Sequence, residues 1–272
     1  MKKILLFGFV MYGAVCVFGQ ATQQAANSQR PKLPIEYFAE YNLYKDEMGK
    51  SHQNDKSSHY CYEEALQVCP KGWHLPSQSE WAGIFSYDRK LGKKEAEPVT
   101  INGVTKNYFS EYMKSSDNPQ IRYGIRFKRD PDMELDNRLL SAYRYEFFGV
   151  APLNSALKVT VRYLGETFKG TISNIANEEY WAQNNKGDIV RIFPLAGYHI
   201  NMSMSIGDVG GMGMYWTSST SIETCCGYCP RMVWIWEKIE PKITVRCDDG
   251  SFSATDKERQ SVYSVRCIKD ND

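Results

Sequence analysis

Seven of the eight cysteines in this 272-residue chain lie beyond residue 60, and no other feature constrains the fold as much. In an oxidising compartment such a set forms disulfides in preference to metal sites, and an odd number leaves at least one thiol unpaired or joined to another molecule. Whether the protein is exported to an oxidising compartment therefore determines whether these cysteines form disulfides. They are Cys61, Cys69, Cys225, Cys226, Cys229, Cys247 and Cys267.

Residues 1–19 indicate export. Two lysines precede an apolar run from Ile4 to Phe18, and a small residue, Gly19, ends the segment. The run is short for a bilayer span of about 20 residues, so the pattern is that of a secretory signal peptide, cleaved after Gly19. Acylation at Cys16 is the less favoured alternative, because Val15 stands where lipoproteins usually carry Gly or Ala.

A flexible leader and one domain are expected after the signal. Residues 20–34 are polar, lack aromatic residues and contain two prolines, which is typical of a flexible segment. Aromatic residues are frequent from there to the end, and no second linker of this kind follows, so we expect one domain over 35–272. Its middle, about 92–190, matches no pattern that we can assign and is treated as inserted or divergent.

We expect Cys225, Cys226, Cys229 and Cys247 to form further structural disulfides. Cys226 and Cys229 also have the Cys-x-x-Cys spacing of thiol oxidoreductases, but only 43 residues follow Cys229, too few for the rest of a thioredoxin fold. A zinc site formed by Cys226, Cys229 and Cys247 would lack a second close pair of ligands. We therefore predict no metal and no cofactor.

Two helices are predicted before residue 92. Good helix formers over 62–68 end before Pro70, which must break the helix. Ser77 and Glu80 then form a capping box, in which the Ser77 hydroxyl accepts from the Glu80 N–H and the Glu80 carboxylate reaches back to the Ser77 N–H. The second helix is expected over about 78–90, with three apolar residues buried at helical spacing, Trp81, Ile84 and Phe85.

Strands are predicted in the second half of the chain. Five runs are rich in β-branched or aromatic residues and show alternation. Helices first and antiparallel strands later favour an α+β domain. The five runs are 158–163, 188–193, 232–236, 242–247 and 262–268.

Three segments together resemble one family. They are Tyr60–Trp81, with its Cys-Pro-Lys-Gly-Trp-His-Leu-Pro run and final Glu-Trp; Gly213–Thr220, with Tyr-Trp-Thr-Ser-Ser; and Ser264–Asp270, with Ser-Val-Arg-Cys. In order and character they are similar to the major paralogous domain family named from Fibrobacter succinogenes, the FISUMP domain, which is common in exported proteins of Bacteroidetes-type bacteria. The resemblance covers both ends of the domain and not its middle.

The resemblance implies a C-type-lectin-like α+β fold, similar also to the formylglycine-generating enzyme family. In that fold two N-terminal helices pack on a small twisted antiparallel sheet with long loop insertions. It further implies a disulfide between Cys69 and Cys267. The remaining motif residues would have structural roles, namely Trp73, His74, Pro76, Glu80, Trp81, Tyr215, Trp216, Ser218 and Arg266.

One departure from C-type lectins bears on function. Their calcium-dependent sugar site needs Glu-Pro-Asn or Gln-Pro-Asp, whereas this chain has Glu240-Pro241-Lys242, in which the lysine is not an oxygen ligand. Calcium-mediated sugar binding is therefore not expected.

These observations favour an exported, non-enzymatic recognition or structural module of the bacterial cell surface, at most peripheral to or displayed from the outer membrane. An extracellular or periplasmic location is the alternative. Its partner would be an unknown surface protein or glycan, bound through variable loops. The 33 Lys+Arg residues balance the 32 Asp+Glu residues, which argues against binding to nucleic acid. We predict no catalytic residue, because His74 has no Ser, Cys or acid at the spacing of a known catalytic motif.

Two other functions remain open. A calcium-independent carbohydrate-binding adhesin would use Trp234 and Trp236, which share one face of a predicted strand and would form a stacking surface if exposed. An enzyme of the formylglycine-generating type, or a thiol-redox enzyme, would use Cys226 and Cys229.

Overall fold

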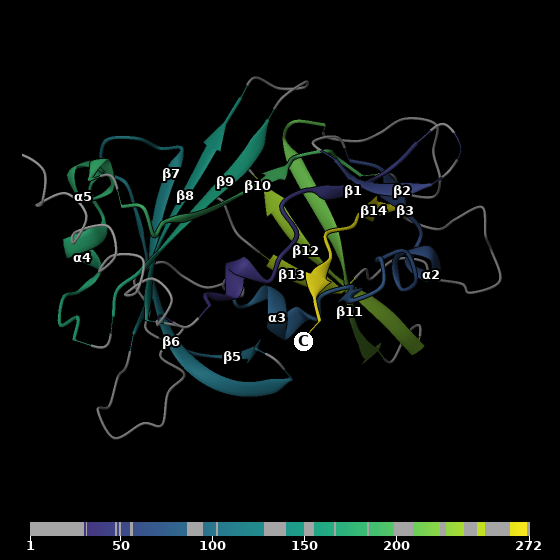
Figure 1. Cartoon of the computed structure of the whole chain (residues 1–272), viewed down its shortest axis with the longest axis horizontal. Coiled ribbons are helices and arrows are strands. Elements are labelled where there is room, and N and C mark those ends of the chain that lie inside the picture. Colours follow the sequence, from purple (N-terminus) through teal and green to yellow (C-terminus); the bar gives the residue numbers. More distant parts are fainter. Residues whose placement is uncertain are drawn as a thin grey trace, which may run out of the picture. The chain divides into compact units, whose positions relative to one another are not determined.

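Strands form most of the regular secondary structure (Figure 1). The described residues from Lys32 onward belong to one compact unit, Lys32–Asp272. Within the described part of the chain, no helix is both long enough and apolar enough to cross a membrane. The computed structural model describes residues 30, 32–46, 48, 50–54, 57–85, 95–101, 103–127, 140–149, 155–165, 167–183, 185–198, 209–223, 227–236, 244–247 and 262–270.

The larger sheet is an antiparallel meander of six strands in the order β10-β9-β8-β7-β6-β5. Each strand pairs with its neighbour in sequence, so only local connections are needed. Ile101 pairs with Val104, which leaves a two-residue turn, and Gly103 in this turn has a φ of +73°, a conformation that favours glycine. The strands are β5 Glu95–Ile101, β6 Val104–Lys114, β7 Ile121–Phe127, β8 Ser141–Phe148, β9 Ala156–Tyr163 and β10 Ile189–Pro194.

The second sheet has five strands in the order β13-β12-β11-β14-β3 and brings the two ends of the domain together. Its long hairpin has a register shift between Trp216 and Thr220. The strands are β3 His59–Tyr60, β11 Met212–Glu223, β12 Gly227–Trp236, β13 Thr244–Cys247 and β14 Tyr263–Ser264.

Two small ladders complete the strands. One joins β1, Asn42–Lys45, to β2, Ser51–Asn54. The other joins β4, Trp73–His74, to β15, Ile268–Lys269. The β4–β15 ladder is a second place where early and late parts of the chain meet.

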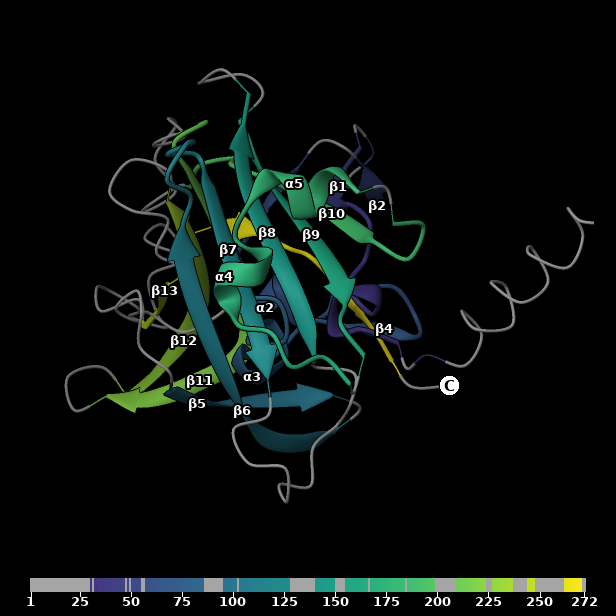
Figure 2. The same cartoon turned by 90° about the vertical axis from the view of Figure 1, so that its left-hand side faces the viewer.

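The helices are single turns. A 3-10 turn, η1 Pro34–Glu36, and two helices, α2 Tyr62–Ala65 and α3 Gln78–Trp81, come from the N-terminal part of the chain. Two more, α4 Ile172–Ile175 and α5 Glu178–Ala182, lie in front of the six-stranded sheet in Figure 2. There Ile172 and Ile175 pack with residues of β7 and β8 in a small apolar cluster on the outer face of the sheet.

The prediction of a C-type-lectin-like α+β fold, with two N-terminal helices packed on a small sheet, is wrong. The structure is mostly β, and its largest element is the six-stranded sheet. The capping box of Ser77 and Glu80 is confirmed, as is burial of the three apolar residues that follow it. However, α3 ends at Trp81, because the next residues turn with i→i+3 hydrogen bonds such as Ile84 N–H to Trp81 C=O.

The predicted strands at 158–163, 188–193, 232–236 and 242–247 correspond to β9, β10, β12 and β13. The run 262–268 does not form one strand, since its middle bonds to an early segment instead of continuing a ladder. The Ala39 N–H donates to the Cys267 carbonyl, and the Leu43 N–H donates to the Val265 carbonyl.

A single aromatic core joins the six-stranded sheet to the motif segments. Its inner face contributes Tyr143, Tyr145 and Phe147 of β8, whose side chains alternate with those of the outer face. Trp81 lies within the same core, with ring centroids 4.8 Å from Phe38 and 5.6 Å from Tyr215. The strands β8, β9 and β10 are therefore packed against the segments that surround the six-stranded sheet in sequence.

A buried arginine links the sheet to α3. Arg126 of β7 is fully buried and donates to the carbonyl groups of Ala82 and Gly83, which follow the helix. It also donates to the Tyr143 hydroxyl at 2.9 Å and to the Ser110 hydroxyl at 3.3 Å. A cation that binds the free carbonyls at the end of a helix satisfies groups that would otherwise be buried without partners.

Replacing Arg126 with Met should destabilise the domain by about 3 kcal/mol, because several buried acceptors lose their donor. Arg122→Met is the matched control, since Arg122 lies on the same strand and donates to carbonyl groups near its own turn. Urea unfolding of both variants measures the effect. An equal decrease in the free energy of unfolding in the two variants would contradict the proposed structural role of Arg126.

Candidate functional site

The three motif segments, which are far apart in sequence, lie against one another. The Ser218 N–H donates to the Pro76 carbonyl at 2.9 Å. The indole of Trp216 is buried, and it donates to the Tyr60 carbonyl at 2.7 Å. Its ring centroid is 4.4 Å from that of Tyr263. The Tyr-Trp-Thr-Ser-Ser segment therefore joins the first motif segment to the last strands.

Cys69 and Cys267 form a disulfide, with sulfurs 2.08 Å apart, which confirms the pairing implied by the family resemblance. The bridge spans a sequence separation of 198 residues and lies beside the β4–β15 ladder, where His74 pairs with Ile268. Closing a loop of this length restricts the unfolded chain by about 4–5 kcal/mol in the chain-entropy model. Cys61 is a free thiol, and burial raises its pKa.

His74 bridges two carboxylates. Its Nδ1 lies 2.5 Å from Asp270 Oδ1, and its Nε2 lies 3.1 Å from Glu80 Oε1. Glu80 is held in turn by the capping box, through the Ser77 N–H at 2.7 Å. The imidazole thus connects the first turn of α3 to the C-terminal segment.

The two carboxylates determine the charge of His74. Its hydrogen bond to Glu80, followed by that to Asp270, raises the pKa of His74 to about 9 despite partial burial. Burial acts to raise the pKa of Glu80, but the bonds from His74 and Ser77 outweigh it and lower that pKa. At neutral pH the group is an imidazolium between two carboxylates, which is the wrong protonation state for a general base.

Arg266, in the third motif segment, is a buried cation held by several hydrogen bonds. It is fully buried, and its Nε donates to Asn42 Oδ1 at 2.6 Å. Its other nitrogens donate to the carbonyl groups of Ala39 (2.9 Å), Glu40 (2.6 Å) and Ile192 (2.5 Å). Burial lowers the pKa of Arg266 to about 10, so it remains charged at neutral pH.

Tyr215 completes this buried group. Its hydroxyl donates to the Pro194 carbonyl at 2.7 Å and accepts from the Asn42 amide at 3.3 Å. Burial raises the pKa of Tyr215 to about 12, so it is a neutral hydrogen-bonding group. Arg266 and Tyr215 therefore bind the N-terminal segment to β10.

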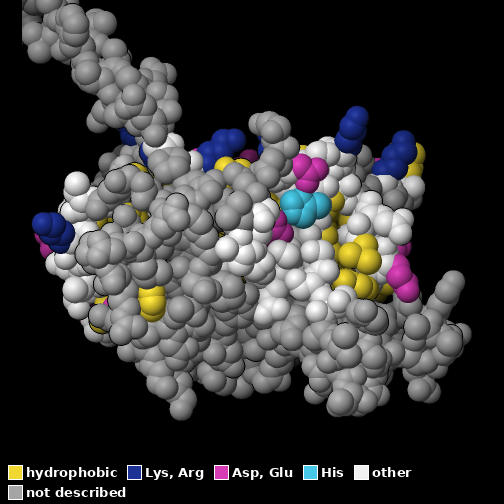
Figure 3. All heavy atoms as spheres, turned by 90° about the horizontal axis from the view of Figure 1, so that it is seen from below, with side chains coloured by type: hydrophobic (Ala, Val, Ile, Leu, Met, Phe, Trp, Pro, Cys, Tyr) yellow, Lys and Arg dark blue, Asp and Glu magenta, His cyan; other side chains and the backbone are white. Residues whose placement is uncertain are grey.

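A pocket of about 150 Å³ lies next to His74. Figure 3, seen from below, shows a surface histidine beside acidic side chains, with hydrophobic side chains on the same face. The pocket is bounded by η1, α3, the β5–β6 turn and the C-terminal strand β15. Its polar lining includes His74, Glu80, Thr100, Lys269 and Asp270.

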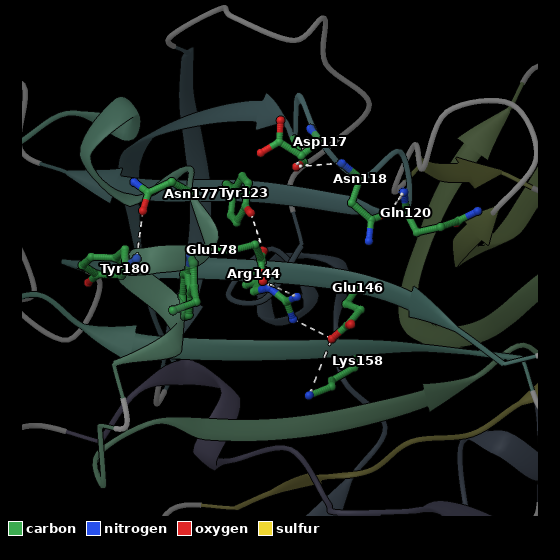
Figure 4. A network of polar contacts seen from close by, with 12 residues as sticks. Asp117, Asn118, Gln120, Tyr123, Arg144, Glu146, Lys158, Asn177, Glu178 and Tyr180 are labelled. Atoms are coloured by element: carbon green, nitrogen blue, oxygen red, sulfur yellow. Dashed lines mark hydrogen bonds and ion pairs between the residues drawn. The ribbon is translucent and has the colours of Figure 1, made fainter.

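A second polar network lies on the outer face of the six-stranded sheet (Figure 4). Arg144 donates to both carboxylate oxygens of Glu178 in α5, at 3.2 and 3.0 Å, and to Glu146 at 2.5 Å. The Tyr123 hydroxyl also donates to Glu178, at 2.6 Å. Burial and this bond raise the pKa of Tyr123 to about 12. Lys158, 3.6 Å from Glu146, ends the network, which fastens α5 to the sheet.

The other predicted residues have mixed outcomes. Trp73 is half-buried in β4, and Trp81 is a core residue whose buried indole N–H has no partner among the described residues. Trp234 and Trp236 are in β12, but their side chains lie outside the description, as do those of Cys229 and Cys247. Cys225 and Cys226 are themselves outside the described residues, so the predicted disulfide cluster stays a prediction.

Sequence reasoning missed three contributors to the site. Asp270 ends the third motif segment, but no local signal shows that it would bind His74. Asn42 and Tyr37 lie before the first motif, and they reach the site only because the chain folds back on its C-terminal strand. The Lys269 N–H donates to the Tyr37 carbonyl at 2.8 Å.

The fold and the site define a mostly antiparallel β protein whose ends are joined by a disulfide and by buried polar contacts. The chain belongs to the family described as a domain of unknown function (DUF8237), whose model matches residues 30–267. No curated protein and no solved structure matches it.

Replacing both Cys69 and Cys267 with Ser should lower the free energy of unfolding by about 4 kcal/mol, since the unfolded chain regains its freedom. Cys61→Ser is the control and should change it by less than about 0.5 kcal/mol, because Cys61 is unpaired. Guanidinium unfolding compares the variants, and non-reducing peptide mapping locates the bridge. A loss in the control as large as that in the double variant would refute this assignment.

Stability should decrease as the pH rises from about 6.5 through about 9. The folded pKa of His74 is about 9 and its ordinary value is 6.5, so its contribution is fully present below pH 6.5 and is lost as the imidazolium deprotonates. The side chain is 43% exposed, so solvent screening weakens the effect. Thermal unfolding from pH 6 to 10 should show a flatter profile for His74→Gln than for the His59→Gln control.

Proposed function

We propose that this chain is an exported, non-enzymatic recognition or structural module of the bacterial cell surface, which binds a surface protein or a glycan. The main support for the proposal is that polar side chains of the motif segments form hydrogen bonds within the fold. His74, Glu80, Trp216 and Arg266 bond to other parts of the fold, and neither His74 nitrogen is available as a base. Such residues maintain a scaffold, and the surface of the scaffold is left for recognition.

The disulfide supports the exported part of the proposal. A bridge such as Cys69–Cys267 is stable in oxidising compartments and rare in the cytosol. The signal-like segment 1–19 and the resemblance of the three motif segments to the FISUMP domain family point in the same direction. We use that resemblance only to support export, because the C-type-lectin-like fold that it implies differs from the structure.

The outer face of the six-stranded sheet supports recognition rather than catalysis. Phe148, Val190 and Ile192 are exposed by 40–43%, and the strand register places all three on this face, with β9 between Phe148 and the other two. Exposed apolar side chains next to the charged network of Arg144 and Glu146 are typical of interaction surfaces.

Labelling of intact producing cells with a membrane-impermeant amine reagent tests the proposal. The protein should be labelled before lysis, should carry an oxidised Cys69–Cys267 pair, and should cross-link in the native envelope to one recurring protein or glycan. Ile192→Lys should reduce that cross-linking, whereas Leu66→Lys, which changes an exposed apolar residue of similar accessibility elsewhere, should not. Labelling only after lysis, with both thiols reduced, would refute export.

A further inference from the structure

The pocket beside His74 has features that a scaffold role does not explain. Maintaining the fold requires the bonds among His74, Glu80 and Asp270, but it does not require an open space of about 150 Å³ beside them. The pocket combines charged and hydroxyl groups with an apolar wall, which is the usual composition of a small-molecule site. The apolar wall is formed by Pro34, Phe38 and Ile268.

We propose that this pocket binds a single neutral sugar ring, with its hydroxyls hydrogen-bonded to Asp270 and one face of the ring against Tyr37. The inference rests on the proposed recognition function and names a ligand class for it.

The charges around the pocket favour an uncharged ligand. The pocket lining carries two carboxylates, Glu80 and Asp270, and two basic side chains, His74 and Lys269, so its formal charges cancel. His74 forms ion pairs with both carboxylates. A charged ligand would have to compete with the existing bonds between His74 and these carboxylates, which solvent reaches because the His74 and Asp270 side chains are 43% and 47% exposed. A polyol adds hydrogen bonds without disturbing the balance.

Hydrogen-bonding capacity remains at the pocket. Asp270 uses Oδ1 for His74, while its Oδ2 has no hydrogen bond to any described residue, and the side chain is 47% exposed. A carboxylate oxygen accepts strongly from hydroxyl groups. The Thr100 hydroxyl donates to Ser79 at 2.5 Å and lies 2.8 Å from the Thr105 hydroxyl, which leaves it one lone pair to accept a further bond.

The shape and rigidity of the pocket fit one ring. Its volume equals the share of about five water molecules, which is room for a single ring and too little for a peptide strand. Tyr37 is half-buried and lines the pocket, and the ammonium of the exposed Lys32 lies over its ring, 5.5 Å from the centroid. The adjacent disulfide and the β4–β15 ladder hold the walls in place, which reduces the entropy lost on binding.

Saturation-transfer NMR with the exported, oxidised protein at pH 7 tests the proposal. The probes are neutral hexoses and N-acetylhexosamines, a uronic acid as the anion, and lysine amide as the cation. At least one neutral sugar should bind, and both charged probes should bind more weakly. Asp270→Asn and Tyr37→Leu should each raise the Kd of that sugar by about tenfold or more.

Asp117→Asn is the matched control, because Asp117 is an exposed carboxylate in the β6–β7 turn outside the pocket, and it should leave the Kd unchanged. Thr100→Val is a second pocket variant, to be used if Asp270→Asn lowers the melting temperature. Preferential binding of either charged probe, or sugar binding that no pocket variant weakens, would overturn the proposal. If no sugar binds while intact cells are still labelled, the sugar site is refuted and the recognition function stands.

Discussion

The buried guanidinium of Arg266 determines where several distant segments must lie. A charged group without solvent needs hydrogen-bond partners, and those of Arg266 include three backbone carbonyls and the amide oxygen of Asn42. They come from the segment before β1, from β1 itself and from β10. The disulfide at the next residue, Cys267, adds a covalent tie to the region after α2. The segment between β14 and β15 is therefore held on two sides within two residues.

Two other arginines connect separate parts of the fold in a similar way. Arg126 connects the end of α3 to the six-stranded sheet, as Arg266 connects the two ends of the domain. It donates to the carbonyl groups of Ala82 and Gly83, which are outside the strand ladders. Arg144 fastens α5 to the opposite face of that sheet. Three arginines thus connect elements that the strand ladders leave separate, and the aromatic core around Trp81 fills the space between them. This explains how single-turn helices remain fixed in place.

Several elements were readable from the sequence because their causes are local. The capping box begins α3 at Ser77, and β-branched alternation marks β9 and β10. A missed signal was also local. Asn102-Gly103 is a strong hairpin turn sequence and lies where β5 meets β6, so two of the unassigned strands could have been found. In β8 the alternation of Tyr143, Tyr145 and Phe147 with charged residues was a second such signal.

By itself the sequence determined the start of α3, the positions of several strands and, through the family resemblance, the Cys69–Cys267 pairing. Only the tertiary structure decided that α3 stops after one turn, that strands β5–β10 form one sheet sharing the main core, and that Asp270 meets His74. The reason is physical. Caps and alternation depend on neighbours along the chain, whereas a buried arginine or a bridged histidine depends on partners that only folding brings together.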